Sequence, residues 1–234
     1  MNPADMRRDY TAGSLARADL DANPIQQFED WFASANNEQG GLRWRKISLA
    51  LFKLWHAILG HSAPDANAMV LATADKTGKP SSRTILLKGV DERGFIFFTN
   101  YDSRKGRELA ENPYGALTFY WQELERQVCI TGTVSKVSAS ESEDYFKSRP
   151  RDSRLAAWAS NQSDTIPNRA ALEKKWREMS AKYPDEIPLP PNWGGYALKP
   201  ERIEFWQGRP GRMHDRFSYT LQPDNSWKPE RLSP

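Results

Sequence analysis

The helix that the sequence predicts over residues 104–111 begins with an unusually basic turn. Ser103 suits the N-cap position. The first turn then carries Arg104, Lys105 and Arg107. Because a helix N-terminus is already positive and repels cations, we expect an anion there, and backbone N–H groups flanked by Arg and Lys commonly hold phosphate. A solvated basic helix is the alternative interpretation.

Two further cations, Arg83 and Lys88, interrupt an otherwise apolar strand. This strand is the middle one of a predicted β-meander over residues 68–74, 84–90 and 95–99. Charged side chains in an apolar strand usually need a partner for each charge. Their odd spacing places them on opposite faces of the strand unless a bulge intervenes. Together with the basic helix, they favour a phosphate-bearing ligand over a solvated edge strand.

A third cationic group lies near the C-terminus, in a strand predicted over residues 212–219. At a period of two residues, one face carries Arg212, His214 and Arg216, while Met213 lies on the other face. Adjacent cationic or titratable side chains repel each other unless water or an anion screens them. The spacing is equally compatible with a solvent-facing strand and with a ligand site.

Composition and charge limit the classes of protein to which the chain belongs. Its 234 residues are 38% hydrophobic, 12% aromatic and 27% charged, which is typical of a globular chain with one large domain. The net charge of +3 is small, so the overall field does not demand a nucleic-acid partner. The one cysteine, Cys129, excludes an internal disulfide, and three histidines without ligand spacing predict no metal site.

The N-terminal sequence predicts a protein that is neither exported nor embedded in a membrane. Residues 1–10 lack the apolar core of a signal peptide, and no uncharged stretch approaches the roughly 18 residues that span a bilayer. We therefore expect a cytoplasmic setting. The polar segment of residues 1–22 is expected to be flexible.

Hydrophobic periodicity predicts a mainly β chain with flanking helices. Beyond the meander, strands are expected over residues 115–121, 127–137, 196–198, 202–207, 212–219 and 227–232. Helices are expected over residues 25–34, 42–59, 138–147, 154–160 and 168–182. Consecutive antiparallel strands between residues 68 and 137 indicate a barrel or a sandwich.

The helix predicted over residues 42–59 is strongly amphipathic. Its apolar stripe consists of Trp44, Ile47, Leu51, Leu54, Trp55 and Ile58, opposite a basic face. Such a stripe must be buried against something. We favour packing on the chain's own barrel or on a dimer partner. A partner-protein surface or shallow contact with an anionic membrane is the alternative.

Several separated motifs follow one another in an order that resembles a known family. They are RRDY (7–10), SRTILLK (82–88), FFTNYDSRKG (97–106), LERQV (124–128), YFKSRPRDS (145–153), NQS (161–163), IEFWQG (203–208), RMHDRF (212–217) and the terminal RLSP. Together they resemble the pyridoxine/pyridoxamine 5'-phosphate oxidases. The resemblance implies a mainly β, α+β fold, the antiparallel FMN-binding split β-barrel, in a homodimer. We expect a single domain over residues 1–234, in which residues 38–61 depart from the family pattern and look like an insertion.

The resemblance implies residues for a cofactor site and for a substrate site. The FMN residues are Arg83, Thr84, Ile85, Leu86, Leu87, Lys88, Phe98, Thr99, Arg104, Lys105, Gln127, Gln162, Ser163, Trp206 and Arg216. The substrate residues are Arg7, Arg8, Asp9, Tyr10, Lys88, Tyr145, Arg149, Ser153, Arg212, Met213 and His214. Of these, residues 7–10 would form a flap over the substrate, and Arg212 and His214 would lie nearest the chemistry. Phe98 departs from the family pattern, which has Tyr there.

The activity implied by the resemblance is oxidation of pyridoxamine or pyridoxine 5'-phosphate to pyridoxal 5'-phosphate, with dioxygen as acceptor and release of hydrogen peroxide. A related split-barrel FMN oxidase of the phenazine type is one alternative, and a flavin- or phosphate-binding module without turnover is another. Lys88, Tyr145, Arg149 and Ser153 are all present, which favours the vitamin phosphate as substrate.

Overall fold

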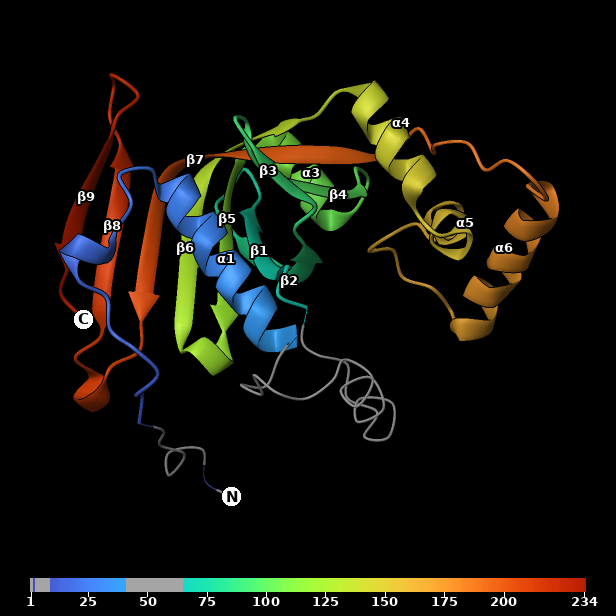
Figure 1. Ribbon diagram of the computed structural model, residues 1–234. Helices are drawn as coiled ribbons and strands as arrows, with labels where there is room; N and C mark the ends of the chain where they lie inside the picture. Colours follow the sequence, from blue (N-terminus) through green and yellow to red (C-terminus); the bar gives the residue numbers. More distant parts are fainter. Residues whose placement is uncertain (1, 3–8, 41–64) are drawn as a thin grey trace. The chain divides into compact units, whose positions relative to one another are not determined.

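A computed structural model describes residues 2, 9–40 and 65–234 (Figure 1). Its helices are α1 (Pro24–Gly40), α3 (Arg104–Glu111), α4 (Ala139–Ser148), α5 (Arg151–Ala159) and α6 (Arg169–Lys182), with short 3-10 turns η2 (Arg17–Asp19), η3 (Gln122–Leu124) and η4 (Pro210–Arg212). Its strands are β1 (Ala68–Ala74), β2 (Pro80–Leu86), β3 (Gly89–Asp91), β4 (Gly94–Asn100), β5 (Tyr114–Trp121), β6 (Arg126–Lys136), β7 (Trp193–Gln207), β8 (Asp215–Leu221) and β9 (Trp227–Leu232). The amphipathic helix predicted over residues 42–59 lies outside the described residues, as do Arg7 and Arg8, so these predictions stay untested.

The strands form an antiparallel sheet. Hydrogen bonds join them in the order β2-β1-β5-β6-β7-β4-β3, and β8 and β9 continue from β7. Strand β4 pairs with the first part of β7, with Phe98 opposite Gly195, and β8 pairs with its last part, with Trp206 opposite Arg216. Pro200 has no N–H to donate and lies between these two registers. The two strands predicted over residues 196–198 and 202–207 are therefore one strand with two partners.

The strand predicted over residues 84–90 is also different in the structure. It is divided into β2 and β3, because the chain leaves β1 after Leu86 and joins β4 at Gly89. The N–H of Lys88 already donates to the carbonyl of Ile96 at 2.8 Å. The interruption removes the strict alternation of faces between Arg83 and Lys88.

A third correction concerns the strand predicted over residues 212–219. Residues Pro210–Arg212 form the turn η4, in which Gly211 and Arg212 both have a positive φ, 62° and 60°. Strand β8 begins only at Asp215. Arg212 and His214 therefore do not alternate along a strand with Arg216, and the predicted cationic face is wrong.

The chain divides into two compact units, and the first consists of residues 1–70, 117–130 and 201–234. In its described part, α1 packs its apolar side on β5, with the Phe28 ring centroid 5.0 Å from that of Phe119. Trp31 meets Phe205 edge to face at 5.2 Å. These buried aromatic rings form the core of the first unit.

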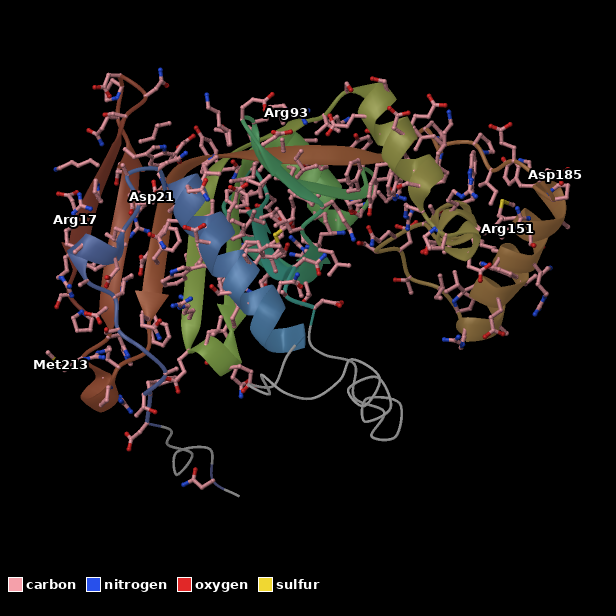
Figure 2. The ribbon with its side chains drawn as sticks, viewed as in Figure 1. Arg17, Asp21, Arg93, Arg151, Asp185 and Met213 are labelled. Atoms are coloured by element: carbon pink, nitrogen blue, oxygen red, sulfur yellow. The ribbon has the colours of Figure 1, made fainter. Side chains whose placement is uncertain are left out.

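The second unit consists of residues 71–116 and 131–200. Around β4 and the first part of β7 it carries α3, α4, α5 and α6 (Figure 1). One of its core clusters consists of Phe146, Leu155, Ile187 and Trp193. Arg151 fastens the chain after α6 by donating to the carbonyl of Asp185 at 3.1 Å (Figure 2). This division into two units does not test the prediction of a single domain.

Candidate functional site

A cavity of about 850 Å³ lies in the second unit. It brings together residues that the sequence analysis placed in both sites: Arg83, Thr84, Ile85, Leu86, Lys88, Phe98, Thr99, Arg104, Lys105, Tyr145, Arg149, Ser153, Gln162 and Ser163. Leu87 is buried and does not line the cavity. Arg83 and Lys88 both line this one cavity, because the strand is interrupted between β2 and β3. Other lining residues are not predicted from the sequence, among them Ser81, Asn100, Ser160 and Trp193.

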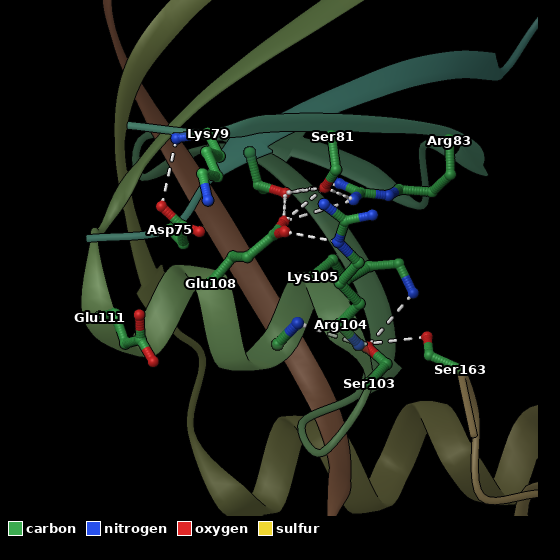
Figure 3. A network of polar contacts seen from close by, with 12 residues as sticks. Asp75, Lys79, Ser81, Arg83, Ser103, Arg104, Lys105, Glu108, Glu111 and Ser163 are labelled. Atoms are coloured by element: carbon green, nitrogen blue, oxygen red, sulfur yellow. Dashed lines mark hydrogen bonds and ion pairs between the residues drawn. The ribbon is translucent and has the colours of Figure 1, made fainter. Parts of the chain in front are cut away.

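The basic helix start is built as its sequence predicts. Helix α3 spans the predicted residues, and the Ser103 hydroxyl accepts from the N–H of Gly106 at 3.3 Å. The N–H of Arg104 donates to the hydroxyl of Ser163 at 3.1 Å, with Ser163 held at φ 78°. A distant loop thus supplies the residue that covers this helix end (Figure 3).

Lys105 is the most informative cation of the cavity, because the residue is only 5% exposed. Its ammonium contacts the hydroxyls of Thr99 (3.2 Å) and Ser103 (3.3 Å) and the amide oxygen of Gln162 (3.0 Å). All three are neutral acceptors, and no described carboxylate lies within ion-pair distance. Burial, and then repulsion by Arg83, lowers the pKa of Lys105 to about 8. The charge of a bound anion would compensate both for the burial of the ammonium and for the repulsion by Arg83.

Arg83 lies in the same cluster but already has an anionic neighbour. Its guanidinium donates to the hydroxyl of Thr73 at 2.6 Å and to the carbonyl of Leu71 at 3.2 Å, and lies 3.5 Å from the carboxylate of Glu108. Burial lowers the pKa of Arg83, although Glu108 acts in the opposite direction. Glu108 is not among the residues predicted from the sequence, although its spacing of four residues from Arg104 was an available signal.

Other residues of the cavity form a flat aromatic wall with an arginine beside it. The ring centroid of Phe98 lies 3.9 Å from that of Tyr145 and 5.7 Å from that of Trp193, with planes within 18° of parallel. The guanidinium of Arg149 lies 4.7 Å from the Trp193 ring centroid. Its Nη1 is buried and makes no hydrogen bond with the described residues. Burial lowers the pKa of Arg149, and no carboxylate among the described residues forms an ion pair with its guanidinium.

Another group of predicted residues lies in the first unit, around His214. The ring centroids of Tyr10 and Trp206 lie 5.5 Å and 4.7 Å from that of His214. Tyr10 also lies against Gly208, where a Cβ atom would be 2.7 Å from the tyrosine ring. The N–H of Arg209 donates to Nδ1 of His214 at 3.1 Å. The neutral imidazole therefore carries its proton on Nε2 and presents it as a donor.

The remaining predicted residues of the first unit differ in their surroundings. Arg216 donates from Nε to Glu204 at 2.8 Å and is also paired with that carboxylate through Nη2. Arg212 is exposed, and Met213 is 71% exposed (Figure 2). Gln127 is half-buried on β6, and Asp9 is exposed. Arg216 thus has a protein partner, whereas Arg212 has a side chain open to solvent.

No group of three or more His, Cys, Asp or Glu side chains among the described residues has a geometry that could hold a metal ion. Among the same residues, no helix has the length and apolar character to cross a bilayer.

Comparison with known proteins places this geometry in a family. Residues 62–183 match the profile of a family described as pyridoxamine 5'-phosphate oxidase, and residues 193–234 match that of a pyridoxine 5'-phosphate oxidase C-terminal dimerisation region. The pyridoxine/pyridoxamine 5'-phosphate oxidases of Paraburkholderia phytofirmans and Trichormus variabilis are 52% and 51% identical to the chain over 232 residues, 99% of this chain and 98% of each relative. The chain belongs to the pyridoxine/pyridoxamine 5'-phosphate oxidase family.

Solved structures agree with this family at the level of the fold. PhzG from Burkholderia lata, in complex with tetrahydrophenazine-1-carboxylic acid, has a TM-score of 0.76 and 31% identity, covering 93% of this chain and 95% of that chain. A pyridoxamine 5'-phosphate oxidase-related, FMN binding protein from Nostoc punctiforme has a TM-score of 0.61 and 20% identity, covering 81% of this chain and 100% of that chain. The predicted split-barrel fold is confirmed.

Proposed function

We propose that the chain is an FMN-dependent oxidase that converts pyridoxamine and pyridoxine 5'-phosphates to pyridoxal 5'-phosphate. The observation that carries this proposal is a cavity with unmet cationic groups on two different elements. Among the described residues, no carboxylate forms an ion pair with the buried Lys105 on α3, and no acceptor bonds to the buried Nη1 of Arg149 after α4. One phosphate on the cofactor and one on the substrate would meet these two needs.

We assign the FMN phosphate to the helix start. The donors there are the side chains of Arg104 and Lys105 and the backbone of the first turn, and Gln162 and Ser163 close the site from a distant loop. The flavin ring is assigned to the cavity beside residues 83–88 of β2 and the loop that follows it. The substitution of the family's tyrosine by Phe98 leaves the backbone of β4 available to this ring.

The substrate phosphate is assigned to Lys88, Tyr145, Arg149 and Ser153. Arg149 supplies a planar fork of donors, and its stacking on Trp193 limits the orientations of that fork. The hydroxyls of Tyr145 and Ser153 and the ammonium of Lys88 complete the set of donors. This arrangement explains how a small pyridine ring would be held by its phosphate while its other end remains free to react.

FMN, when bound, would supply the redox chemistry: the substrate would be oxidised at C4' by loss of a hydride and a proton, and dioxygen would be reduced to hydrogen peroxide. The alcohol substrate would give the aldehyde directly, whereas the imine formed from the amine substrate would be hydrolysed by water to the aldehyde and ammonia. The chain's own contribution is to orient the reacting carbon and exclude competing geometries. We assign His214 to the substituent on C4', as a donor through Nε2, because Nδ1 is already occupied by the N–H of Arg209. Arg212 is assigned to charge stabilisation at the same substituent.

Residues of the first unit belong to this proposal through the dimer. The match of residues 193–234 to a dimerisation region supports a homodimer, and we place the flavin at the subunit boundary, where Gln127, Trp206 and Arg216 would also contribute. The expected protein is yellow, binds one FMN per chain and sediments as a dimer. A colourless monomer that does not take up added FMN would contradict this proposal.

A phenazine-type oxidase is the second candidate, because PhzG shares the fold at 31% identity. The discriminating experiment supplies the FMN-loaded protein with pyridoxamine 5'-phosphate, pyridoxine 5'-phosphate or tetrahydrophenazine-1-carboxylic acid and measures hydrogen peroxide. We expect peroxide and an equal amount of pyridoxal 5'-phosphate with the two vitamin phosphates. Peroxide with the phenazine compound alone would favour the second candidate.

A further inference from the structure

The carboxylate of Glu108 lies between the guanidinium groups of Arg83 and Arg104 (Figure 3). Glu108 is only 6% exposed. Its Oε1 accepts from Nε of Arg104 at 2.8 Å. Its Oε2 accepts from the hydroxyls of Thr73 and Ser81, each at 2.5 Å, and lies 3.5 Å from Nη2 of Arg83. Burial alone would raise the pKa of Glu108, but the hydrogen bonds from Ser81, Thr73 and Arg104 hold it below its ordinary value. The carboxylate is therefore ionised at neutral pH.

The hydroxyls of Thr73 and Ser81 connect Glu108 to Arg83 through hydrogen bonds. A hydroxyl has only one hydrogen to donate, and both hydroxyl hydrogens are directed to the carboxylate. Their oxygens are thereby left to accept from the two terminal nitrogens of Arg83: Nη1 donates to Thr73 at 2.6 Å, and Nη2 donates to Ser81. The order of donors and acceptors in this network depends on a charged acceptor at position 108.

Arg104 is held by Glu108 in a different way. Only its Nε is used by the carboxylate, and its two terminal nitrogens make no hydrogen bond with the described residues. The side chain is 59% exposed and would be free to rotate without this contact. Glu108 thus fixes the Nε end of the guanidinium and leaves its two terminal nitrogens as donors for a ligand at the helix start.

The charges of the cluster also match a particular kind of anion. Arg83, Arg104 and Lys105 contribute three positive charges and Glu108 one negative charge, which leaves a balance of +2. A phosphate monoester carries about −1.5 to −2 at pH 7. Without the carboxylate, the free protein would hold three mutually repelling cations, one of which is buried.

We propose that Glu108 is the positioning residue of the phosphate site: it holds Arg83 through two hydroxyls, directs the donors of Arg104, and balances the cluster for a phosphate monoester. The proposal rests on the proposed function, because it takes the phosphate to be that of FMN. A carboxylate repels an anion directly. The proposal predicts that Glu108 nevertheless strengthens phosphate binding, because it orders the cations that contact the phosphate.

The test compares the affinity for FMN with that for riboflavin, which lacks the phosphate group. Glu108→Gln keeps the shape of the side chain and removes its charge. We expect the FMN affinity to fall by roughly tenfold or more, as for loss of a charged hydrogen bond, while the riboflavin affinity stays unchanged. Flavin fluorescence titration of the apoprotein gives both constants, so the result does not depend on turnover.

Glu111→Gln is the matched control. Glu111 lies on the same helix and is exposed, and its one hydrogen bond with the described residues is a long one of 3.4 Å from the N–H of Lys76. The same chemical change there should leave the FMN to riboflavin ratio at the wild-type value. Glu108→Asp keeps the charge on a shorter side chain, and we expect a ratio between those of wild type and Glu108→Gln. It also serves as the test variant if Glu108→Gln does not fold.

Several outcomes would overturn the proposal. If Glu108→Gln binds FMN as tightly as wild type, or more tightly, the carboxylate only opposes the anion. If the affinities for FMN and riboflavin fall by the same factor, the residue supports the cavity generally and does not act on the phosphate. If Glu108→Gln does not fold and Glu108→Asp keeps the wild-type ratio, the proposal fails as well. A wild-type protein that does not prefer FMN over riboflavin would instead contradict the proposed function, before any variant is compared.

Discussion

The ammonium nitrogen of Lys105 lies 3.0 Å from the amide oxygen of Gln162, a residue 57 positions further along the chain. An amide oxygen accepts a hydrogen bond but does not neutralise a charge, and no carboxylate of the described residues lies within ion-pair distance of this ammonium. Its low exposure and its lowered pKa of about 8 are two consequences of the same arrangement. Because this pKa lies close to neutral pH, we expect the affinity for an anion to change between pH 7 and 9.

The first prediction is that FMN binding weakens as the pH rises from 7 to 9. In the free protein Lys105 loses its proton near pH 8, whereas a bound phosphate favours the charged form and raises that pKa. Above pH 8 binding must therefore take up a proton, and the dissociation constant should rise by up to about tenfold per pH unit. Titration of the apoprotein with FMN at several pH values measures this slope.

Lys105→Arg is the control for that slope, because a guanidinium stays protonated throughout this range. Whatever the variant's affinity at pH 7, its dependence on pH should be nearly flat between pH 7 and 9. The assignment of the effect to Lys105 is wrong if the variant keeps the wild-type slope, or if the wild type shows none.

The second prediction separates the two phosphate sites. Arg149→Ala removes a stacked guanidinium whose Nη1 bonds to no acceptor in the described part of the chain. We expect the KM for pyridoxamine 5'-phosphate to rise while the flavin content stays nearly unchanged. A charge-assisted contact of about 1.5–3 kcal/mol corresponds to a change of roughly tenfold to over a hundredfold. Arg104→Ala should instead lower the FMN affinity. Steady-state kinetics and absorbance of the purified variants measure both effects.

The two variants serve as controls for each other, because each removes one guanidinium from the lining of the same cavity. Loss of flavin from Arg149→Ala without a change in KM would reverse the assignment. Equal losses of flavin from both variants would indicate a single anion site.

The third prediction concerns the aromatic wall, in which Phe98 and Tyr145 stack at 3.9 Å. Phe98→Leu keeps an apolar side chain but removes the stacking, which is worth about 0.5–1.5 kcal/mol for an aromatic pair. For a chain of this size the melting temperature should fall by roughly 1–6 °C. Phe98→Tyr, which restores the residue of the family pattern, should keep both the melting temperature and the flavin content.

Differential scanning calorimetry of the apoproteins checks this prediction without interference from the ligand. If Phe98→Leu melts at the wild-type temperature, the stack contributes nothing to the stability of the folded chain. If Phe98→Tyr gains flavin affinity, the family's hydroxyl does make a contact that this chain lacks.

Local signals in the sequence were sufficient for part of this site. The cap, the basic turn and the end of α3 are encoded within ten neighbouring residues, and both ends of the helix were predicted to the residue. Strand β1 was predicted equally well, because its composition and its flanking turn agree. Arg83 and Lys88 stood out because charges in an apolar strand need partners.

Contacts over long distances in the sequence explain what was missed. Glu108 reads as one more charged residue on an exposed helix, because two of its partners, Thr73 and Ser81, lie 35 and 27 residues away. The division of the predicted strand at Leu87 depends on β4, which the chain reaches only after a turn. The turn at Gly211 and Arg212 was hidden by a polar pattern that also fits a strand. Gln162 was found only through the family resemblance, since nothing local distinguishes it.

The most direct test of the proposed function measures reduction of the bound flavin in the absence of oxygen. The FMN-loaded protein is mixed anaerobically with pyridoxamine 5'-phosphate or with pyridoxamine, which lacks the phosphate, and the flavin absorbance band is followed. We predict rapid bleaching with the phosphorylated compound, much slower bleaching at the same concentration of the other, and return of the band with peroxide release when air is admitted. A flavin that stays oxidised with pyridoxamine 5'-phosphate, or that bleaches equally fast with pyridoxamine, would contradict a phosphate-recognising oxidase.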